Sequence, residues 1–163
     1  MKTKIEFFTI GVYDSTEEGF FTKLRENRID TFCDIRQRRG VRGAKYSFVN
    51  SQRLQAKLEN IGIQYAHITG LAPTQEIREL QALADKQAGV LKREREELGE
   101  TFKLAYKTQI LDSFDFDEFL ETLERSGAAR VVFFCVEASP LACHRSIVTD
   151  ALKKRGFVHI THL

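Results

Sequence analysis

The sequence predicts an α/β protein with three layers, in which helices cover both faces of a mostly parallel, open sheet of about five strands. Three observations predict this class. Short apolar runs alternate along the chain with amphipathic stretches of helical periodicity. The run 130–136 (RVVFFCV) is almost wholly apolar, as expected for a central strand covered on both faces. Three helical stretches end at a glycine that leads directly into the next strand: Gly62, Gly127 and Gly156.

The first half of the chain supplies three of the expected strands. Residues 4–11, 31–36 and 63–68 are short, apolar and β-branched or aromatic, and two helices connect them. The first helix follows Ser15-Thr16-Glu17-Glu18, which we interpret as a capping box with Ser15 as the cap. The second helix covers 51–61, where the apolar residues recur at helical spacing.

The second half supplies a helical region and two more strands. Thr74 is expected to cap a long polar helical stretch toward residue 99, which Gly89 divides into two helices. The charged segment 92–97 (KREREE) is expected to be solvated. Helical stretches near 101–111, 116–123 and 147–152 follow, and 157–162 is a closing strand. We expect one domain over residues 1–163, with 72–111 as a possible helical insertion.

Composition excludes several classes of protein. The chain has 163 residues, 42% of them hydrophobic, which is enough for a core of its own. No apolar run approaches the ~18 residues of a membrane span, and no signal peptide is recognisable, so we expect a cytoplasmic protein without a membrane partner. The three cysteines are too few for a disulfide scaffold and are expected to be free thiols.

The formal net charge of +2 hides an uneven distribution. Residues 36–58 contain seven basic side chains and no acidic one, whereas 108–124 contain six acidic side chains and no basic one. The basic segment favours an anionic partner. Pairing of the two segments between two copies of the chain would instead give a homodimer.

Polar residues follow the strands of the predicted sheet, where parallel sheets bind their ligands. Gly11 follows the first strand, Asp34 and Arg36 close the second, and Glu137 follows the strand 130–136. The loop from there ends in Cys143-His144-Arg145 at the start of the last helix, whose N-terminus favours an anion. The sequence therefore predicts a site for a small anionic or phosphorylated ligand at this edge.

Roles within that site follow from residue chemistry. Cys143, at a helix N-terminus beside basic residues, is a candidate nucleophile, and His144 and Glu137 are candidates for acid/base catalysis. Arg36 and Arg145 are expected to hold the anion. Structural alternatives stay open for these residues: packing in the core for Cys143, and capping of loop amides for Asp34. Arg36 would then pair with Asp34 or Glu137, and Glu137 would only orient Arg145.

The spacing of residues does not match the motifs of metal, phosphatase or nucleotide-binding sites. Cys135, Cys143 and His144 could approach one another, with Cys33 nearby, but no CxxC pair or HxxxH spacing is present, and we expect no metal and no cofactor. Cys33 and Cys135 are interpreted as core residues. A cysteine phosphatase loop requires an arginine six positions after its cysteine, but Leu141 stands there for Cys135 and Thr149 for Cys143. No phosphate-binding P-loop or dinucleotide-binding glycine motif occurs.

A nucleic-acid-binding module remains the alternative. The segment 36–57 mixes arginines with glycines and aromatic residues, so its cations could contact phosphates while Tyr46 or Phe48 stacks on a base. These residues therefore leave three functions open: an enzyme, a nucleic-acid binder and a dimeric interaction protein.

Four short motifs in order resemble the family of the domain of unknown function 488. They are Thr9-Ile10-Gly11, Asp34-Ile35-Arg36, Gly62-Ile63-x-Tyr65 and Cys135-x-Glu137-x-x-Pro140-x-x-Cys143-His144-Arg145. The resemblance spans essentially the whole chain. It implies a single α/β domain and a shared set of residues at the strand ends, but no particular reaction. Two positions depart from the family pattern: Val12-Tyr13 stands where members often have His-Ser, and Ala72-Pro73 where they often have Gly-Gly.

Overall fold

The computed structural model describes residues 4–163, apart from the side chain of Arg93. In this part of the chain five strands form one parallel sheet in the order β3-β2-β4-β1-β5, which confirms the predicted sheet. The strands are β1 (Glu6–Ile10), β2 (Thr31–Asp34), β3 (Gln64–His67), β4 (Arg130–Phe134) and β5 (Ile160–His162).

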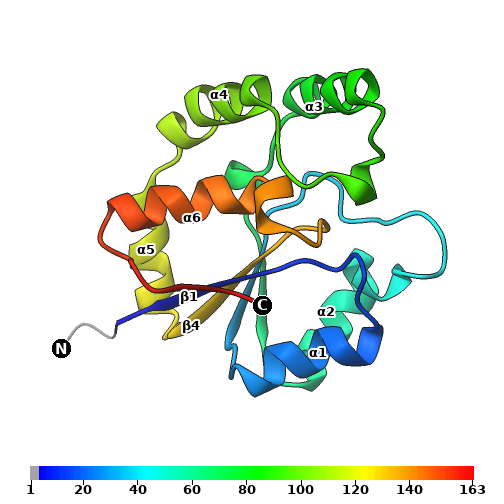
Figure 1. Cartoon of the computed structure of the whole chain (residues 1–163). Coiled ribbons are helices and arrows are strands. Elements are labelled where there is room, and N and C mark those ends of the chain that lie inside the picture. Colours follow the sequence, from blue (N-terminus) through cyan, green and yellow to red (C-terminus); the bar gives the residue numbers. More distant parts are fainter. Residues whose placement is uncertain (1–3) are drawn as a thin grey trace.

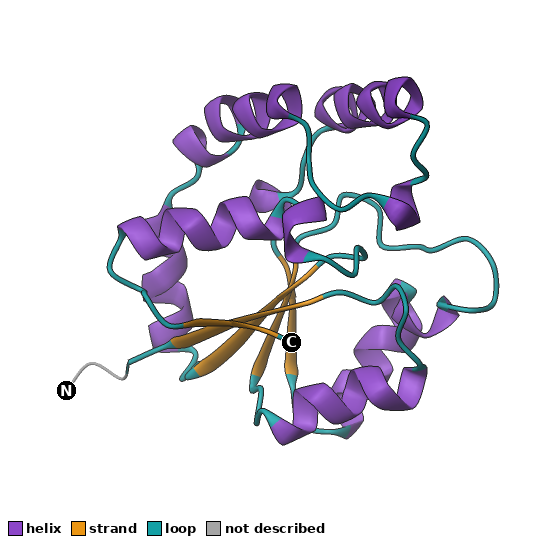
Figure 2. Ribbon diagram, in the orientation of Figure 1, coloured by secondary structure: helices purple, strands orange, loops and turns teal. Residues whose placement is uncertain are grey.

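Helices cover both faces of the sheet, as Figures 1 and 2 show, and give the three-layer α/β/α arrangement. They are α1 (Glu17–Glu26), α2 (Ser51–Asn60), α3 (Gln75–Ala88), α4 (Glu100–Gln109), α5 (Phe116–Arg125) and α6 (Arg145–Lys154). Helices α1 and α2 lie together on one side of the strands, and α5 and α6 lie on the other. Helices α3 and α4 lie together at one end of the molecule, beyond α6.

The carboxyl ends of the three central strands are level with one another. Ile10 of β1 and Asp34 of β2 both pair with Phe134 of β4. The loops that follow these strands therefore begin side by side, and backbone bonds continue between two of them: the amides of Val12 and Tyr13 both donate to the carbonyl of Val136 at 3.0 Å. This register places the strand-end residues at one edge.

Phenylalanine side chains build much of the core. Phe20 of α1 is fully buried and contacts Phe32 of β2 and Phe134 of β4, with ring centroids 6.3 and 5.6 Å apart. Burying one such side chain contributes about 2–3 kcal/mol. The last four residues of β4 are also fully buried, as its apolar sequence predicts.

Several boundaries differ from the prediction. All five expected strands exist, but each is shorter, because only the residues in register with a neighbour form ladder bonds. Thr16, not Ser15, caps α1 by accepting from the amide of Gly19. Gly89 ends α3 as expected, with a φ of 69°, a conformation that glycine adopts without strain. The second helix expected between Gly89 and residue 99 is absent, and this stretch holds only the 3-10 turn Lys92–Glu94.

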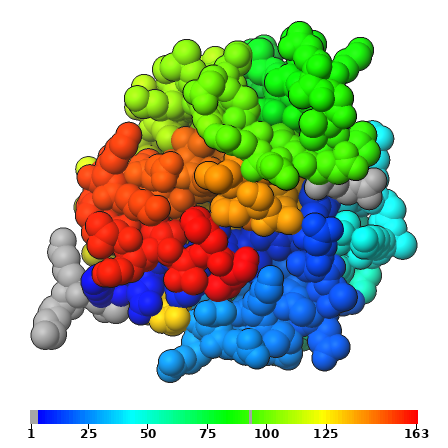
Figure 3. Space-filling view, viewed as in Figure 1, coloured from blue at the N-terminus to red at the C-terminus, as the bar shows by residue number. Residues whose placement is uncertain are grey.

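The segment between β3 and α5 is held by a contact within itself and by contacts with the loop before α6. Tyr106 of α4 is fully buried and donates its hydroxyl to the carbonyl of Leu71 at 2.6 Å. The amide of Leu98 donates to the carbonyl of Leu141 in the loop before α6. Figure 3 accordingly shows the green surface of this segment lying directly on the orange surface of that loop.

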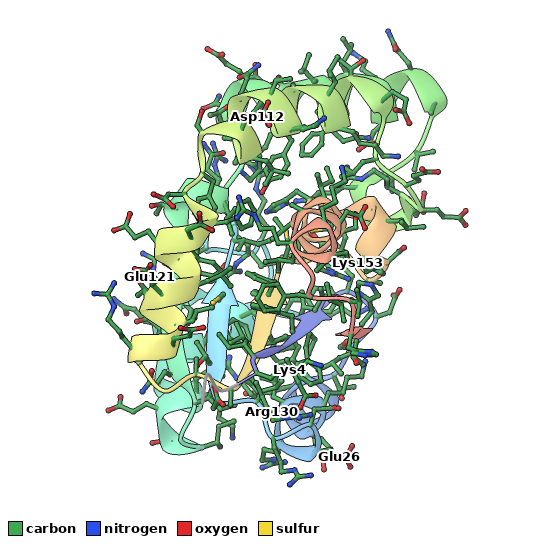
Figure 4. All side chains as sticks on the ribbon, turned by 90° about the vertical axis from the view of Figure 1, so that its left-hand side faces the viewer. Lys4, Glu26, Asp112, Glu121, Arg130 and Lys153 are labelled. Atoms are coloured by element: carbon green, nitrogen blue, oxygen red, sulfur yellow. The ribbon has the colours of Figure 1, made fainter. Side chains whose placement is uncertain are left out.

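The acidic segment lies on the outside of the molecule. Asp112 and Glu121, labelled in Figure 4, are exposed, and α5 turns its buried residues Phe119 and Leu123 inward. Among the described residues no helix is long and apolar enough to cross a membrane.

Candidate functional site

Asp34 and Arg36 form a buried ion pair at the end of β2. The Nε and Nη2 atoms of Arg36 donate to the two carboxylate oxygens of Asp34 at 2.9 and 2.8 Å, and Tyr65 donates its hydroxyl to the same carboxylate at 2.7 Å. Nη2 also donates to the carbonyl of Val49, and the guanidinium lies 4.7 Å from the ring of Phe134. The guanidinium is therefore fixed in one orientation.

One polar atom of this pair has no partner. Nη1 of Arg36 is buried and makes no hydrogen bond with any described residue, although every other nitrogen of the guanidinium is engaged. A buried donor without a partner costs about 1–3 kcal/mol, and more when it is charged. Arg36 lines a cavity at this edge of the sheet.

Arg145 holds the loop that follows β4. It is 1% exposed, and its Nη1 donates to the main-chain carbonyls of Glu137 at 2.6 Å and Cys135 at 3.4 Å, while Nη2 donates to Ala138 at 3.1 Å. Gly11 allows this loop to approach β1, because a Cβ at Gly11 would lie 1.9 Å from the carbonyl oxygen of Glu137. Arg145, Gly11 and Asp34 thus lie behind the cavity wall and do not line it.

Cys135, Cys143 and His144 meet on the floor of the cavity. The two sulfur atoms and one ring nitrogen all lie within 4.8 Å of one another, and Sγ of Cys143 is 3.6 Å from Nδ1 of His144. The Sγ of Cys143 also accepts from the amide of Arg145 at 3.5 Å. Cys135, expected to be a core residue only, is buried but lines the cavity, as do the other two.

The tautomer of His144 follows from its second nitrogen. Nε2 lies 2.7 Å from the carbonyl oxygen of Ile35, which can only accept, so Nε2 carries the proton. In the neutral ring Nδ1 then carries no proton, and its lone pair is directed at the sulfur atoms. Burial lowers the pKa of His144, but Cys135, the Ile35 carbonyl and Glu137 together raise it above the ordinary value. The hydrogen bond with Cys143 and burial raise the pKa of Cys135 to about 12.

The carboxylate of Glu137 pairs with Arg95, a partner that the sequence did not suggest. Its main-chain carbonyl, not its carboxylate, binds Arg145, whereas the carboxylate Oε1 accepts from Nη2 of Arg95 at 2.7 Å. Arg95 also donates to Asp85 at 2.7 Å and to the carbonyl of Ala142. Burial, followed by the nearby Cys135, raises the pKa of Glu137 in spite of the cations beside it.

Arg95 corrects the expectation that 92–97 is solvated. Its side chain is only 9% exposed and crosses from the α3–α4 segment to the loop before α6. No signal in the charged run 92–97 distinguishes this arginine from its exposed neighbours, because its partners are 10, 42 and 47 residues away in the chain.

The cavity has a volume of about 670 Å³ and a positive lining. Its walls come from the loops after β1, β2 and β4 and from the α3–α4 segment. Two carboxylates line it, Asp85 and Glu137, together with six cationic side chains among those described: Arg36, Arg38, Arg42, Arg78, Lys92 and Arg95. Tyr46 also lines it, and its hydroxyl accepts from the amide of Asp14 at 2.9 Å.

The cations differ in how far they are neutralised. Arg95 is shared between the two lining carboxylates, and Arg36 is paired with Asp34. Arg38 and Arg42 are exposed on the cavity wall, and Arg78 donates only to the neutral amide of Gln37. The positive charge therefore lies mainly on the outer wall.

Comparison with known proteins agrees with the sequence motifs. No curated protein and no solved structure matches the chain. One family model, described as "Domain of unknown function DUF488", matches residues 16–152, which contain Asp34, Arg36 and the loop from Glu137 to Arg145. Because this match covers most of the chain, the protein belongs to the DUF488 family.

Proposed function

We propose that the protein binds a small molecule carrying a phosphate-like anion in the cavity at the carboxyl edge of the sheet. The observation that carries the proposal is Nη1 of Arg36. This buried donor has no partner, while the rest of its guanidinium is held rigidly by Asp34 and Val49. An anion oxygen is the acceptor that would satisfy it, with a charge-assisted hydrogen bond.

The charge and size of the cavity support a small ligand. Six cations against two carboxylates give a lining that attracts anions, and arginine forks match the geometry of phosphate. A volume of about 670 Å³ lies within the range of ~300–1,000 Å³ typical of small-molecule sites. The tyrosine ring of Tyr46 offers an apolar surface for the remainder of the molecule.

The basic loop supports nucleic-acid binding less well. Of its seven basic side chains, Arg36 is buried, Arg53 pairs with Glu17 at 3.2 Å, and Arg38 and Arg42 face the cavity. A polymer would need the exposed cations along one continuous surface. Nucleic-acid binding is therefore the competing outcome of the test below.

Isothermal titration calorimetry with inorganic phosphate, pyrophosphate and a mononucleotide tests the proposal, with the uncharged nucleoside as a ligand control. We expect saturable binding of at least one anion. The double variant Arg38→Gln/Arg42→Gln should weaken it by about tenfold or more, since each tenfold loss corresponds to about 1.4 kcal/mol. The matched control Lys45→Gln/Lys57→Gln removes the same charge from the same segment but outside the cavity.

Two results would overturn the proposal. One is the absence of saturable binding for all three anions. The other is an equal loss of affinity in both double variants, which would mean that only overall charge matters. Binding of a single-stranded oligonucleotide that weakens steeply with salt, without binding of the small anions, would instead support the nucleic-acid module.

A further inference from the structure

The cluster on the cavity floor has the composition of a metal site. It contains two thiols and one imidazole from Cys135, Cys143 and His144, and all three residues are at most 6% exposed. Cys135 follows β4, whereas Cys143 and His144 precede α6, so the first two ligands are eight positions apart in the chain. The pattern lacks the close pair typical of structural zinc sites, which is why the spacing predicts no metal.

We propose that Cys135, Cys143 and His144 bind a thiophilic divalent cation, with Zn²⁺ as the principal candidate. Thiolate and imidazole are the ligands that Zn²⁺ prefers in proteins, whereas Mg²⁺ and Ca²⁺ require oxygen ligands. The proposal does not rest on anion binding, because the three ligand atoms are fixed by the fold alone.

The distances already fit a tetrahedral ion. With Zn–S and Zn–N bonds of ~2.3 and ~2.05 Å, a tetrahedral site separates sulfur from nitrogen by ~3.6 Å and sulfur from sulfur by ~3.8 Å. Sγ of Cys143 and Nδ1 of His144 lie 3.6 Å apart, and no pair in the cluster exceeds 4.8 Å. Small rotations of the two cysteine side chains would close the remaining difference.

The surroundings orient each ligand as metal sites require. Nε2–H of His144 donates to the carbonyl of Ile35 at 2.7 Å, which fixes the ring and leaves Nδ1 free to coordinate. Metal-bound histidines almost always make such a bond with their other nitrogen. The amide of Arg145 donates to Sγ of Cys143 at 3.5 Å, which helps to hold the sulfur in place.

Coordination also resolves the charge balance of a buried site. Binding releases the two thiol protons to solvent, so the product is a dication held by two thiolates and one neutral imidazole, with no net charge. Isolated buried thiolates would be costly, and the ion removes that cost.

The fourth coordination position has a plausible neighbour in Glu137. Oε2 of Glu137 lies 3.3 Å from Sγ of Cys135, and its other oxygen is held by Arg95. The three ligands and Glu137 all line the cavity, so a fourth ligand of the ion would come from Glu137 or from the cavity. Three protein ligands with a position open to a cavity is the arrangement of catalytic zinc sites.

Cobalt is the probe for this site. The full-length protein is stripped of metal by a chelator under reducing conditions and titrated with Co²⁺ in a reducing agent that does not bind metals. We expect one equivalent to bind, with a thiolate-to-cobalt charge-transfer band and the visible bands of a tetrahedral ion. Zn²⁺ should displace it, and calorimetry in buffers of different ionisation enthalpy should show release of two protons per Zn²⁺.

Single variants assign the ligands. Cys135→Ala and Cys143→Ala should each abolish the charge-transfer band or weaken Co²⁺ binding by more than the ~10- to 100-fold loss typical of outer-shell partners. Cys33→Ala is the matched control, because Cys33 is equally buried but lies outside the cluster, and it should bind as the unaltered protein does. Circular dichroism establishes that each variant is folded.

X-ray absorption of the Zn²⁺-loaded, unaltered protein keeps the proposal testable if a variant fails to fold. Two sulfur and at least one imidazole scatterer are expected around the ion. A shell without sulfur, the absence of stoichiometric uptake, or a charge-transfer band that survives in both cluster variants would overturn the proposal. Phosphate titration of the stripped protein separates the two proposals: metal uptake without anion binding refutes the proposed function alone, and the reverse refutes the metal site alone.

Discussion

We expect Gly11 to be essential for the close packing of the end of β1 against the loop after β4. Replacing Gly11 by alanine tests this through the free energy of unfolding. The new Cβ would lie 1.9 Å from the carbonyl oxygen of Glu137, whereas ordinary contacts begin near 3.4 Å. The loop must therefore retreat by about 1.5 Å, the difference between these two distances. The neighbouring atom is backbone, so no side-chain rotation can relieve the contact.

The cost follows from what this movement breaks. Arg145 donates to the same carbonyl oxygen at 2.6 Å, and a retreat of that size removes the bond. A hydrogen bond to a charged group contributes about 1.5–3 kcal/mol, and overpacking costs about 1–3 kcal/mol. Gly11→Ala should therefore lower the free energy of unfolding by about 2.5–6 kcal/mol, a large part of the ~5–15 kcal/mol of a typical domain.

Urea unfolding of Gly11→Ala and of a matched Gly40→Ala variant supplies the measurement. At Gly40 a Cβ would meet nothing closer than Oδ1 of Asn50 at 4.0 Å, and the backbone does not need glycine there. That control should be neutral, or more stable by about 0.4–1 kcal/mol, because alanine restricts the unfolded chain. Equal unfolding free energies for the two variants would refute the role assigned to Gly11.

Two further predictions concern charge. Arg95→Gln should destabilise the protein by about 3 kcal/mol in urea unfolding, because it removes the ion-pair partner of Asp85 and leaves Glu137 only the more distant Lys92, at 3.9 Å. Lys103→Gln, whose partners are exposed, should change little, and similar losses in both variants would contradict this reasoning. Burial is the main reason that the pKa of His162 lies below 6.5. An NMR titration of this histidine should therefore give a pKa under 6.5. The stabilising contribution of the neutral ring should then be lost as pH falls through 6.5, and should be absent in His162→Gln.

The fold was predictable because local signals agree with it. The apolar run of β4, the helical stripes and the terminating glycines each indicate one kind of element, and together they allow few topologies. The errors lie where neighbouring residues have equivalent chemistry. Ser15 and Thr16 both carry a hydroxyl suited to capping, and their side-chain chemistry does not decide that Thr16 caps α1.

The sequence predicts at which edge of the sheet the site lies, but not which side chains face the cavity. Parallel strands bring Arg36, Glu137 and His144 to one edge, as the sequence suggests. Whether a side chain faces the cavity or the loop behind it depends on carbonyl positions that no local pattern specifies. Arg145 illustrates this, because three main-chain carbonyls occupy its guanidinium.

The concentration of buried charge at this edge argues for a role beyond stability. Arg36, Arg145 and Glu137 are each at most 5% exposed, and buried ion pairs are often no more stabilising than apolar residues of similar volume. Each of these groups instead fixes a neighbour: Asp34 fixes the guanidinium of Arg36, and Arg145 fixes the loop that carries Cys135 and Glu137. These contacts hold Nη1 of Arg36 and the three potential metal ligands rigidly around one cavity. An edge that served only packing would not need charged groups for this purpose.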